Sequence, residues 1–433
     1  MMQAAVTNFC GLDRRALLAL FATPALAMFL SSNIANAGNL VFNMLFGRWM
    51  GPELYADLAT LLTLKLSLLA VLNAGQMAVS QVVSGQAPGY GAASLRWLNR
   101  VGFVAMGLAL LLVLPPALTG DLGEALGIQS SGALSILLLA LPVTVPLCIL
   151  RGIAVGRLNV FRIVWSANLE MAVRLGGAVL FWQLGYGIEG VALAMALSIV
   201  AGWLPLSRGL GPACADIGGR VLRPVLALAF PFAVLQVAQV LYLDGDILVA
   251  NAVLTPGEVG SVAVLSLIQR VQFFACFGLA AVLLPTVTAA ALRGGSGLRE
   301  AAPVAVLFGL VSIVVVAVLG LAPAKVITVL VGPAFIAAAD VLPLVGLCAV
   351  FFTFSYLCAT YLAALKDIRG IWVVAGFLPL QLSTFVFLSM RDVGMTLPQM
   401  MLAKLVWQGA LSLSLVALIF CSNRSRETAA SAE

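Results

Sequence analysis

Residues 301–323 read AAPVAVLFGLVSIVVVAVLGLAP, a stretch without a single charged side chain. A transmembrane helix needs about 20 mostly apolar residues, because each residue advances a helix by about 1.5 Å and the hydrocarbon core is about 30 Å thick. The stretch therefore predicts a membrane span, and the rest of the chain repeats the pattern. The predicted spans are residues 16–46, 54–84, 97–118, 132–154, 163–185, 188–207, 223–253, 259–290, 301–323, 340–364, 370–390 and 396–421.

The composition leaves almost nothing for a soluble domain. Of the 433 residues, 62% are hydrophobic and 9% are charged. The longest polar interruption, residues 209–223, is too short to bury a core of its own. The fold class is therefore an all-α polytopic membrane protein with about 12 transmembrane helices.

The residue types that are missing exclude several kinds of chemistry. The chain has no histidine, which removes histidine general bases, His-ligated zinc and Ser-His-Asp triads. Its seven cysteines are scattered without close pairs, so no disulfide framework is expected. We predict no catalytic residue, no metal site and no cofactor. The net charge of +6 comes from lysine and arginine, whose distribution indicates the orientation of the chain in the membrane. It does not indicate a nucleic-acid partner.

Lysine and arginine predict that both chain termini face the cytoplasm. In that orientation sixteen of them, Arg151 included, lie on the cytoplasmic side and three lie outside. Cytoplasmic loops carry such an excess of positive charge. The four remaining cations fall within predicted spans and are Lys65, Arg174, Arg270 and Lys404.

A cleavable signal peptide is the alternative for the N-terminus, because Arg14 and Arg15 precede an apolar run that ends near residues 35–37. Cleavage would remove a span that has a counterpart in the second half. We therefore favour an uncleaved first helix.

The two halves of the chain resemble each other. Gly51–Glu53 precedes the second span and Pro256–Glu258 precedes the eighth, and this alignment sets Lys65 against Arg270 at the same offset of 205. An intramembrane cation is rare, so its repetition favours a true repeat over chance. Two six-helix units in the same orientation, residues 1–215 and 216–433, would place a substrate site at their interface.

Three stretches resemble a known family. Residues 39–55 are similar to the first loop of Wzx-like polysaccharide flippases, and residues 151–152, 156–174 and 185–191 are similar to the fourth-to-sixth-span region of that family. These flippases belong to the multidrug/oligosaccharidyl-lipid/polysaccharide exporter superfamily. The resemblance implies a V-shaped pair of six-helix bundles, alternating access, and a substrate that is a glycan on an isoprenoid diphosphate carrier.

Lys65 and Arg270 are the first candidates for a substrate site. A cation at the centre of a membrane helix costs about 2.5–3.5 kcal/mol, so each should face a polar cavity or an acidic partner. If both line the interface between the halves, they form a basic site that suits a diphosphate. The alternative is that each is ion-paired and clamps helices together.

Asp244 and Asp246 are candidates for ion coupling to H⁺ or Na⁺. Residues two apart point in nearly opposite directions on a helix, so both face one cavity only if the helix unwinds at Gly245. Alternatively, one aspartate pairs with Arg270 or Lys65 and the other faces the outer water layer.

Three further charged residues are better explained by structure than by function. Glu170 and Arg174 have the i, i+4 spacing of an intrahelical ion pair, which makes a substrate contact the less favoured interpretation. Lys404 lies near the start of the last span and is expected to extend toward water.

Side-chain amides mark the spans expected to line a wet cavity. A polar stripe within the membrane needs water or polar partners, and sugar hydroxyls would suit it; interhelical hydrogen bonds are the alternative. The candidate substrate-binding amides are Asn33, Asn36, Asn43, Gln76, Gln236 and Gln239.

The leading functional hypothesis is a flippase that moves a lipid-linked glycan across a bacterial cytoplasmic (inner) membrane, with membrane lipids around it and polysaccharide polymerases as partners. The alternative is a cation-coupled multidrug or small-solute exporter of the same superfamily. A membrane enzyme is disfavoured because the outer loops are short and carry few carboxylates. The chain has no phosphate-binding loop for ATP, so an ion gradient or consumption of the product must supply the energy.

Overall fold

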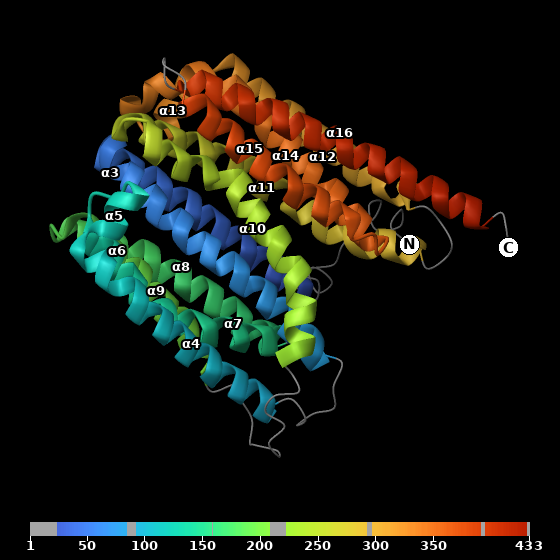
Figure 1. The fold of residues 1–433 in the computed structure, drawn as a ribbon, viewed down its shortest axis with the longest axis horizontal. Helices are drawn as coiled ribbons and strands as arrows, with labels where there is room; N and C mark the ends of the chain where they lie inside the picture. The colour runs from blue at the N-terminus through green and yellow to red at the C-terminus, as the bar shows by residue number, and fades with distance from the viewer. Residues whose placement is uncertain are drawn as a thin grey trace, which may run out of the picture.

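The computed structural model describes residues 24–84, 92–157, 159–207, 222–291, 297–390 and 395–430. This part of the chain is helical throughout, as predicted (Figure 1). Its helices are α3 (Pro24–Ser84), α4 (Ala92–Thr119), α5 (Asp121–Leu126), α6 (Ser131–Leu138), α7 (Leu141–Gly156), α8 (Val160–Gln183), α9 (Gly187–Trp203), η1 (Leu204–Leu206), α10 (Leu222–Val253), α11 (Pro256–Ala291), α12 (Leu298–Leu321), α13 (Pro323–Leu330), η2 (Pro333–Val341), α14 (Leu342–Ala364), α15 (Arg369–Ser389) and α16 (Leu397–Ala430).

Helix α3 contains residues 24–46 of the first predicted span and the whole of the second, and the two parts are joined at Gly51. This residue has φ 71° and ψ 178°, a backbone conformation that favours glycine. Pro52 follows and starts the second half with a preset φ. The Tyr55 hydroxyl donates to Asn43 Oδ1 at 2.9 Å, so the chain folds back and the two halves lie side by side (Figure 1).

The number of spans agrees with the prediction. Among the described residues ten helices are long and apolar enough to cross a membrane, or eleven if α6 and α7, bent by 41°, form one span. One of them is the 48-residue segment of α3, which straight would measure about 72 Å, more than twice the hydrocarbon thickness. Its two halves bring the total to twelve.

The helices form two groups that meet at one end and diverge toward the other (Figure 1). One group contains α3, α4 and α6 to α9, and the other contains α10 to α12 and α14 to α16. Helix α3 faces the other group, packed against α7 and α8 on one side and α10 and α11 on the other. The predicted boundary at residues 215 and 216 lies outside the described residues and stays a prediction. Arg14 and Arg15, on which the disfavoured signal-peptide alternative depends, also lie outside them.

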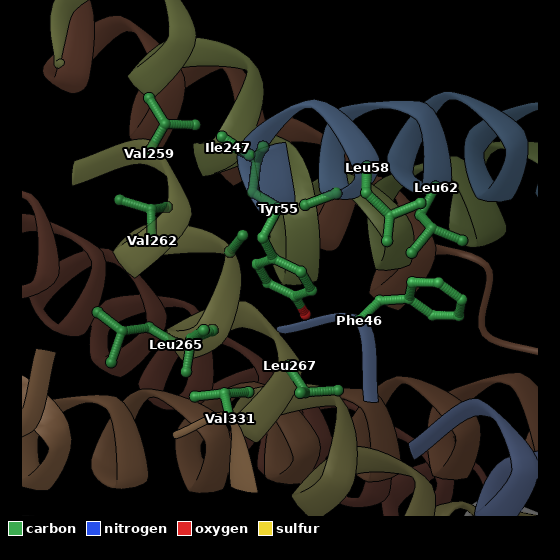
Figure 2. Packing of buried hydrophobic residues seen from close by; sticks show 14 of the residues in the cluster. Phe46, Tyr55, Leu58, Leu62, Ile247, Val259, Val262, Leu265, Leu267 and Val331 are labelled. Carbon is green, nitrogen blue, oxygen red and sulfur yellow. The ribbon is translucent and has the colours of Figure 1, made fainter. Parts of the chain in front are cut away.

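The two groups are packed together at the end near Gly51. Asn251 Nδ2 of α10 donates to Thr60 Oγ1 of α3 at 2.7 Å. Helix α11 comes so close to the turn of α3 that a Cβ added to Gly260 would overlap the Pro52 carbonyl. Side chains of α3, α10 and α11 form one apolar cluster there (Figure 2). In the predicted orientation this closed end faces outward, and the groups diverge toward the cytoplasm.

Candidate functional site

A cavity of about 290 Å³ lies between the two helix groups. Both halves of α3, together with α8 and α11, form its walls, which are apolar apart from asparagines and two arginines. Among the described residues no carboxylate lines it. The lining residues are Asn33, Asn36, Ala37, Asn39, Leu40, Asn43, Leu62, Leu66, Arg174, Leu267, Arg270, Val271, Phe274 and Ala275.

Arg174 reaches the cavity from α8 and is 7% exposed. Its Nη2 donates to Asn39 Oδ1 across to α3 and lies 2.7 Å from Met171 Sδ. Its guanidinium carbon lies 5.7 Å from the centre of the Phe42 ring, within the range of a cation–π contact. Its Nε has no hydrogen-bond partner among the described residues, so a donor remains available. This cation belongs to the cavity.

Arg270 reaches the same cavity from α11. Its Nε lies 3.3 Å from Asp244 Oδ1 of α10. The contact is electrostatic only, because neither atom has a partner with hydrogen-bond geometry in the described part of the chain. The cavity therefore has a guanidinium on each side, one from each helix group.

The asparagines of α3 follow the predicted stripe. Asn33, Asn36 and Asn43 all line the cavity, and Asn39 lies on the same stripe. Asn43 is engaged within the protein, because it accepts from Tyr55 and donates to the Asn39 carbonyl at 2.8 Å. Asn39 contacts Arg174, and Asn36 lies about one helical turn before Asn39 on the same stripe.

Lys65 does not face this cavity, contrary to the expectation of an interface cation. It is 4% exposed, and its Nζ lies 3.4 Å from Glu170 Oε1 of α8 and 3.3 Å from Ser198 Oγ of α9. The alternative interpretation, an ion-paired clamp, describes its environment. The physical reason is the face of α3 on which Lys65 lies, which packs into the first helix group.

Glu170 does not form the expected pair with Arg174. It binds Arg151 Nη2 at 2.9 Å as well as Lys65, and Arg151 also donates to Ser166 Oγ at 2.9 Å. Arg151 thus lies within α7, inside the predicted span of residues 132–154, and joins a largely buried network. Two cations from other helices satisfy Glu170, which leaves Arg174 for the cavity.

Asp246 and Lys404 form a second buried pair, within the second helix group. Lys404 Nζ lies 2.7 Å from Asp246 Oδ2, both side chains are fully buried, and Ser266 Oγ donates to Asp246 Oδ1 at 3.1 Å. The expectation that Lys404 extends toward water is therefore wrong. Of the alternative for the aspartates, one half holds, because Asp244 pairs with Arg270, but the other aspartate pairs with Lys404 and does not face the outer water layer. Helix α10 runs through Gly245 without unwinding, so the two aspartates point to different partners and do not face one cavity.

The three candidate glutamines are not among the residues that line the cavity. Gln239 is buried in α10, while Gln76 of α3 and Gln236 of α10 are half-buried. Sequence reasoning missed the apolar wall instead, notably Leu66, Val271 and Phe274. Nothing in an apolar helix distinguishes a cavity-facing leucine or phenylalanine from one that faces lipid.

The chain resembles known proteins in its three-dimensional structure. The sequence matches no family model and no curated protein. An inward-facing multidrug resistance MATE family transporter of the MOP superfamily is similar over 91% of this chain and 96% of its own, with a TM-score of 0.78 and 14% identity. An outward-facing one covers 94% and 97%, with a TM-score of 0.62 and 16% identity.

A third similar structure is a MOP superfamily transporter from Pyrococcus furiosus, whose reversed binding-pocket polarity suggests a different function. It covers 94% of this chain and 98% of its own, with a TM-score of 0.64 and 16% identity. The chain therefore has the fold of the MATE transporters of the MOP superfamily, with two pseudo-repeat bundles, as predicted. The higher TM-score to the inward-facing structure agrees with the packed end near Gly51.

Proposed function

We propose that this protein is an alternating-access membrane transporter that exports small amphiphilic molecules carrying a negative charge. One observation carries the proposal: Arg174 and Arg270 reach one cavity from the two helix groups, and no described lining residue is acidic. Guanidinium groups bind carboxylate, sulfonate and phosphate with charge-assisted hydrogen bonds. A cationic drug would find no counter-ion on these walls.

The size and walls of the cavity favour a small or partly inserted substrate. At about 290 Å³ it lies at the lower end of ligand pockets, which measure about 300–1,000 Å³. Leucine, valine and phenylalanine side chains would hold an apolar body beside the arginines. Because the helix groups are packed together at the predicted outer end, such a substrate would enter from the cytoplasm.

A lipid-diphosphate-linked oligosaccharide is the second candidate substrate, which would make the protein a flippase in surface polysaccharide assembly with polymerase partners. The observation in its favour is the combination of two guanidiniums with the amides of Asn36 and Asn39. Arginine would hold the diphosphate, and the amides would bind sugar hydroxyls. The lipid tail would remain in the bilayer.

The test is transport in proteoliposomes of two dyes that share a scaffold, one sulfonated and one bearing a quaternary ammonium group. We expect transport of the sulfonated dye and little transport of the cationic one. The reverse preference would overturn the proposal. Lipids extracted from cells that lack the protein address the second candidate, because accumulated isoprenoid-diphosphate glycans in the mass spectrum would identify the flippase substrate.

A further inference from the structure

Two acidic residues two positions apart on α10 are held by their cations in different ways. Asp246 is fixed, because it receives a 2.7 Å contact from Lys404 and a hydrogen bond from Ser266, and no part of the Asp246–Lys404 pair is exposed. Asp244 is held only by the 3.3 Å electrostatic contact with Arg270, and both atoms of that contact lack hydrogen bonds among the described residues. The second pair is therefore easier to separate.

The two members of that looser pair also have different access to the cavity. Arg270 lines it, whereas Asp244 is 1% exposed and lies behind the wall. An anion in the cavity can contact Arg270 directly, but it cannot enter the buried space that Asp244 occupies. If the anion takes the guanidinium, the carboxylate loses its partner and stays buried.

We propose that Asp244 is the resident counter-ion of Arg270, that a substrate anion displaces it, and that the displaced carboxylate takes up one proton from cavity water. The proposal rests on the anionic substrate proposed above. The proton comes from a hydronium ion of the cavity water, where one O–H bond breaks as the O–H bond on Asp244 forms, and the bulk buffer replaces it. No bond of the substrate forms or breaks. Anion and proton would thus bind together.

The surroundings of Asp244 favour proton uptake over a second ion pair. A buried carboxylate without a partner is costly, and the protonated form removes that cost. The charged and titratable groups near it are Arg270 on α11, Asp246 on its own helix, Lys404 on α16 and Tyr55 on α3. Lys404 is engaged by Asp246, and the negative charge of Asp246 also opposes a second negative charge at Asp244.

In this coupling, binding of the substrate promotes binding of the proton, which is the opposite of what happens in an exchanger. Where a proton and a cationic substrate compete for one carboxylate, each expels the other. Here the anion makes room for the proton, so the two would bind together and be carried in the same direction as a neutral pair. An inward proton gradient opposes outward movement of such a pair, so consumption of the exported product would have to drive export. Linkage then requires anion affinity to fall as pH rises, by up to tenfold per pH unit when one full proton is taken up.

Calorimetry with octanesulfonate tests the proposal, because this anion does not itself titrate near neutral pH. The full-length protein in nanodiscs is titrated without Na⁺ in two buffers with different heats of ionisation, and empty nanodiscs serve as the blank. The difference in heat gives the number of protons taken up. We expect about one proton per bound anion at neutral pH.

Two variants distinguish proton uptake from binding of the anion. Asp244→Asn should bind octanesulfonate at least as tightly as the wild type, with proton uptake close to zero. Asp367→Asn is the matched control, because Asp367 forms a 2.7 Å pair with Arg369 in a loop away from the cavity, and it should behave like the wild type. If Asp244→Asn does not fold, the number of protons taken up by the wild type still tests the coupling.

Each of the remaining outcomes would contradict the coupling, the assignment to Asp244 or the anionic substrate. Anion binding by the wild type without proton uptake, or binding that depends on added Na⁺, overturns the coupling and leaves the proposed function intact. Unchanged proton uptake in Asp244→Asn overturns the assignment to this residue. Absence of binding in both the wild type and Asp244→Asn overturns the anionic substrate and the coupling with it.

Discussion

At the scale of single residues, the charges within the membrane divide into paired and available ones. Glu170 joins Lys65 to Arg151, and Asp246 fully engages Lys404. Arg174 differs from all of these because its described partners are an amide, a sulfur and an aromatic ring, none of them negative. A buried guanidinium without a carboxylate can contribute its full charge to a ligand.

Arg174→Gln should therefore weaken octanesulfonate binding tenfold or more. A hydrogen bond to a charged group contributes about 1.5–3 kcal/mol, which corresponds to about a tenfold to hundredfold change in affinity. Binding is measured in nanodiscs as above. Arg162→Gln is the control, because Arg162 lies on the same helix outside the cavity. Equal affinities in the two variants would remove Arg174 from the site.

Glu170→Gln should destabilise the fold more than Lys65→Met does. Removing the carboxylate leaves the buried Lys65 and the half-buried Arg151 without their anion, and breaking a buried pair in this way costs about 3–5 kcal/mol. Removing Lys65 leaves Glu170 still bound to Arg151 at 2.9 Å. The thermal unfolding midpoint in detergent measures the difference.

The same experiment separates a structural role from a substrate contact. Folded Lys65→Met protein should bind octanesulfonate like the wild type, because Lys65 does not line the cavity. Loss of binding in a folded Lys65→Met variant would restore Lys65 as a substrate residue and contradict our assignment.

At the scale of elements, the turn of α3 decides how the cavity is built. Its two halves place Asn36 and Leu66 on one wall, although the residues are 30 positions apart. The turn needs a residue with positive φ at Gly51, and no atom lies within 4 Å of a Cβ built there. The requirement for glycine is therefore one of backbone conformation and not of space.

Gly51→Ala should destabilise the protein by about 1–2 kcal/mol, the cost of holding a residue with a side chain in the left-handed region. Gly75→Ala is the matched control in the same helix, because its Cβ also has no neighbour within 4 Å and its backbone is helical. That control should be neutral or stabilising by up to about 1 kcal/mol. Equal unfolding midpoints for the two variants would contradict a strained turn.

At the scale of the whole molecule, transport by alternating access requires the packed end to open. Asn251 and Thr60 join the two helix groups there by a single 2.7 Å hydrogen bond, and Arg48 adds a bond to the Val329 carbonyl near the end of α13. A cation at the C-terminal end of a helix is favourable. These contacts hold the state in which the cavity faces the predicted cytoplasm.

A short thiol crosslinker between Thr60→Cys and Asn251→Cys, in a background without other cysteines, should stop transport of the sulfonated dye. A reductant should restore it if the linker contains a disulfide. Two cysteines within the first helix group serve as the control and should leave transport unchanged when linked. Continued transport by the fully linked Thr60–Asn251 protein would contradict opening at this end.

The sequence by itself determined the spans, the all-helical fold class and the face of α3 that carries asparagine. Each of these depends on local patterns, since a run of about 20 apolar residues must cross a bilayer whatever its neighbours are. The repeat was visible because Lys65 and Arg270 are rare residues in such runs.

Only the tertiary structure decided which charges belong to the cavity. The sequence paired Glu170 with Arg174 from their spacing, but Lys65 and Arg151 reach Glu170 from α3 and α7. Partner choice depends on which helix faces meet, and helices of the same hydrophobicity give no local signal of their neighbours. For that reason the candidate anion site consists of Arg174 and Arg270, while Lys65 became part of the scaffold.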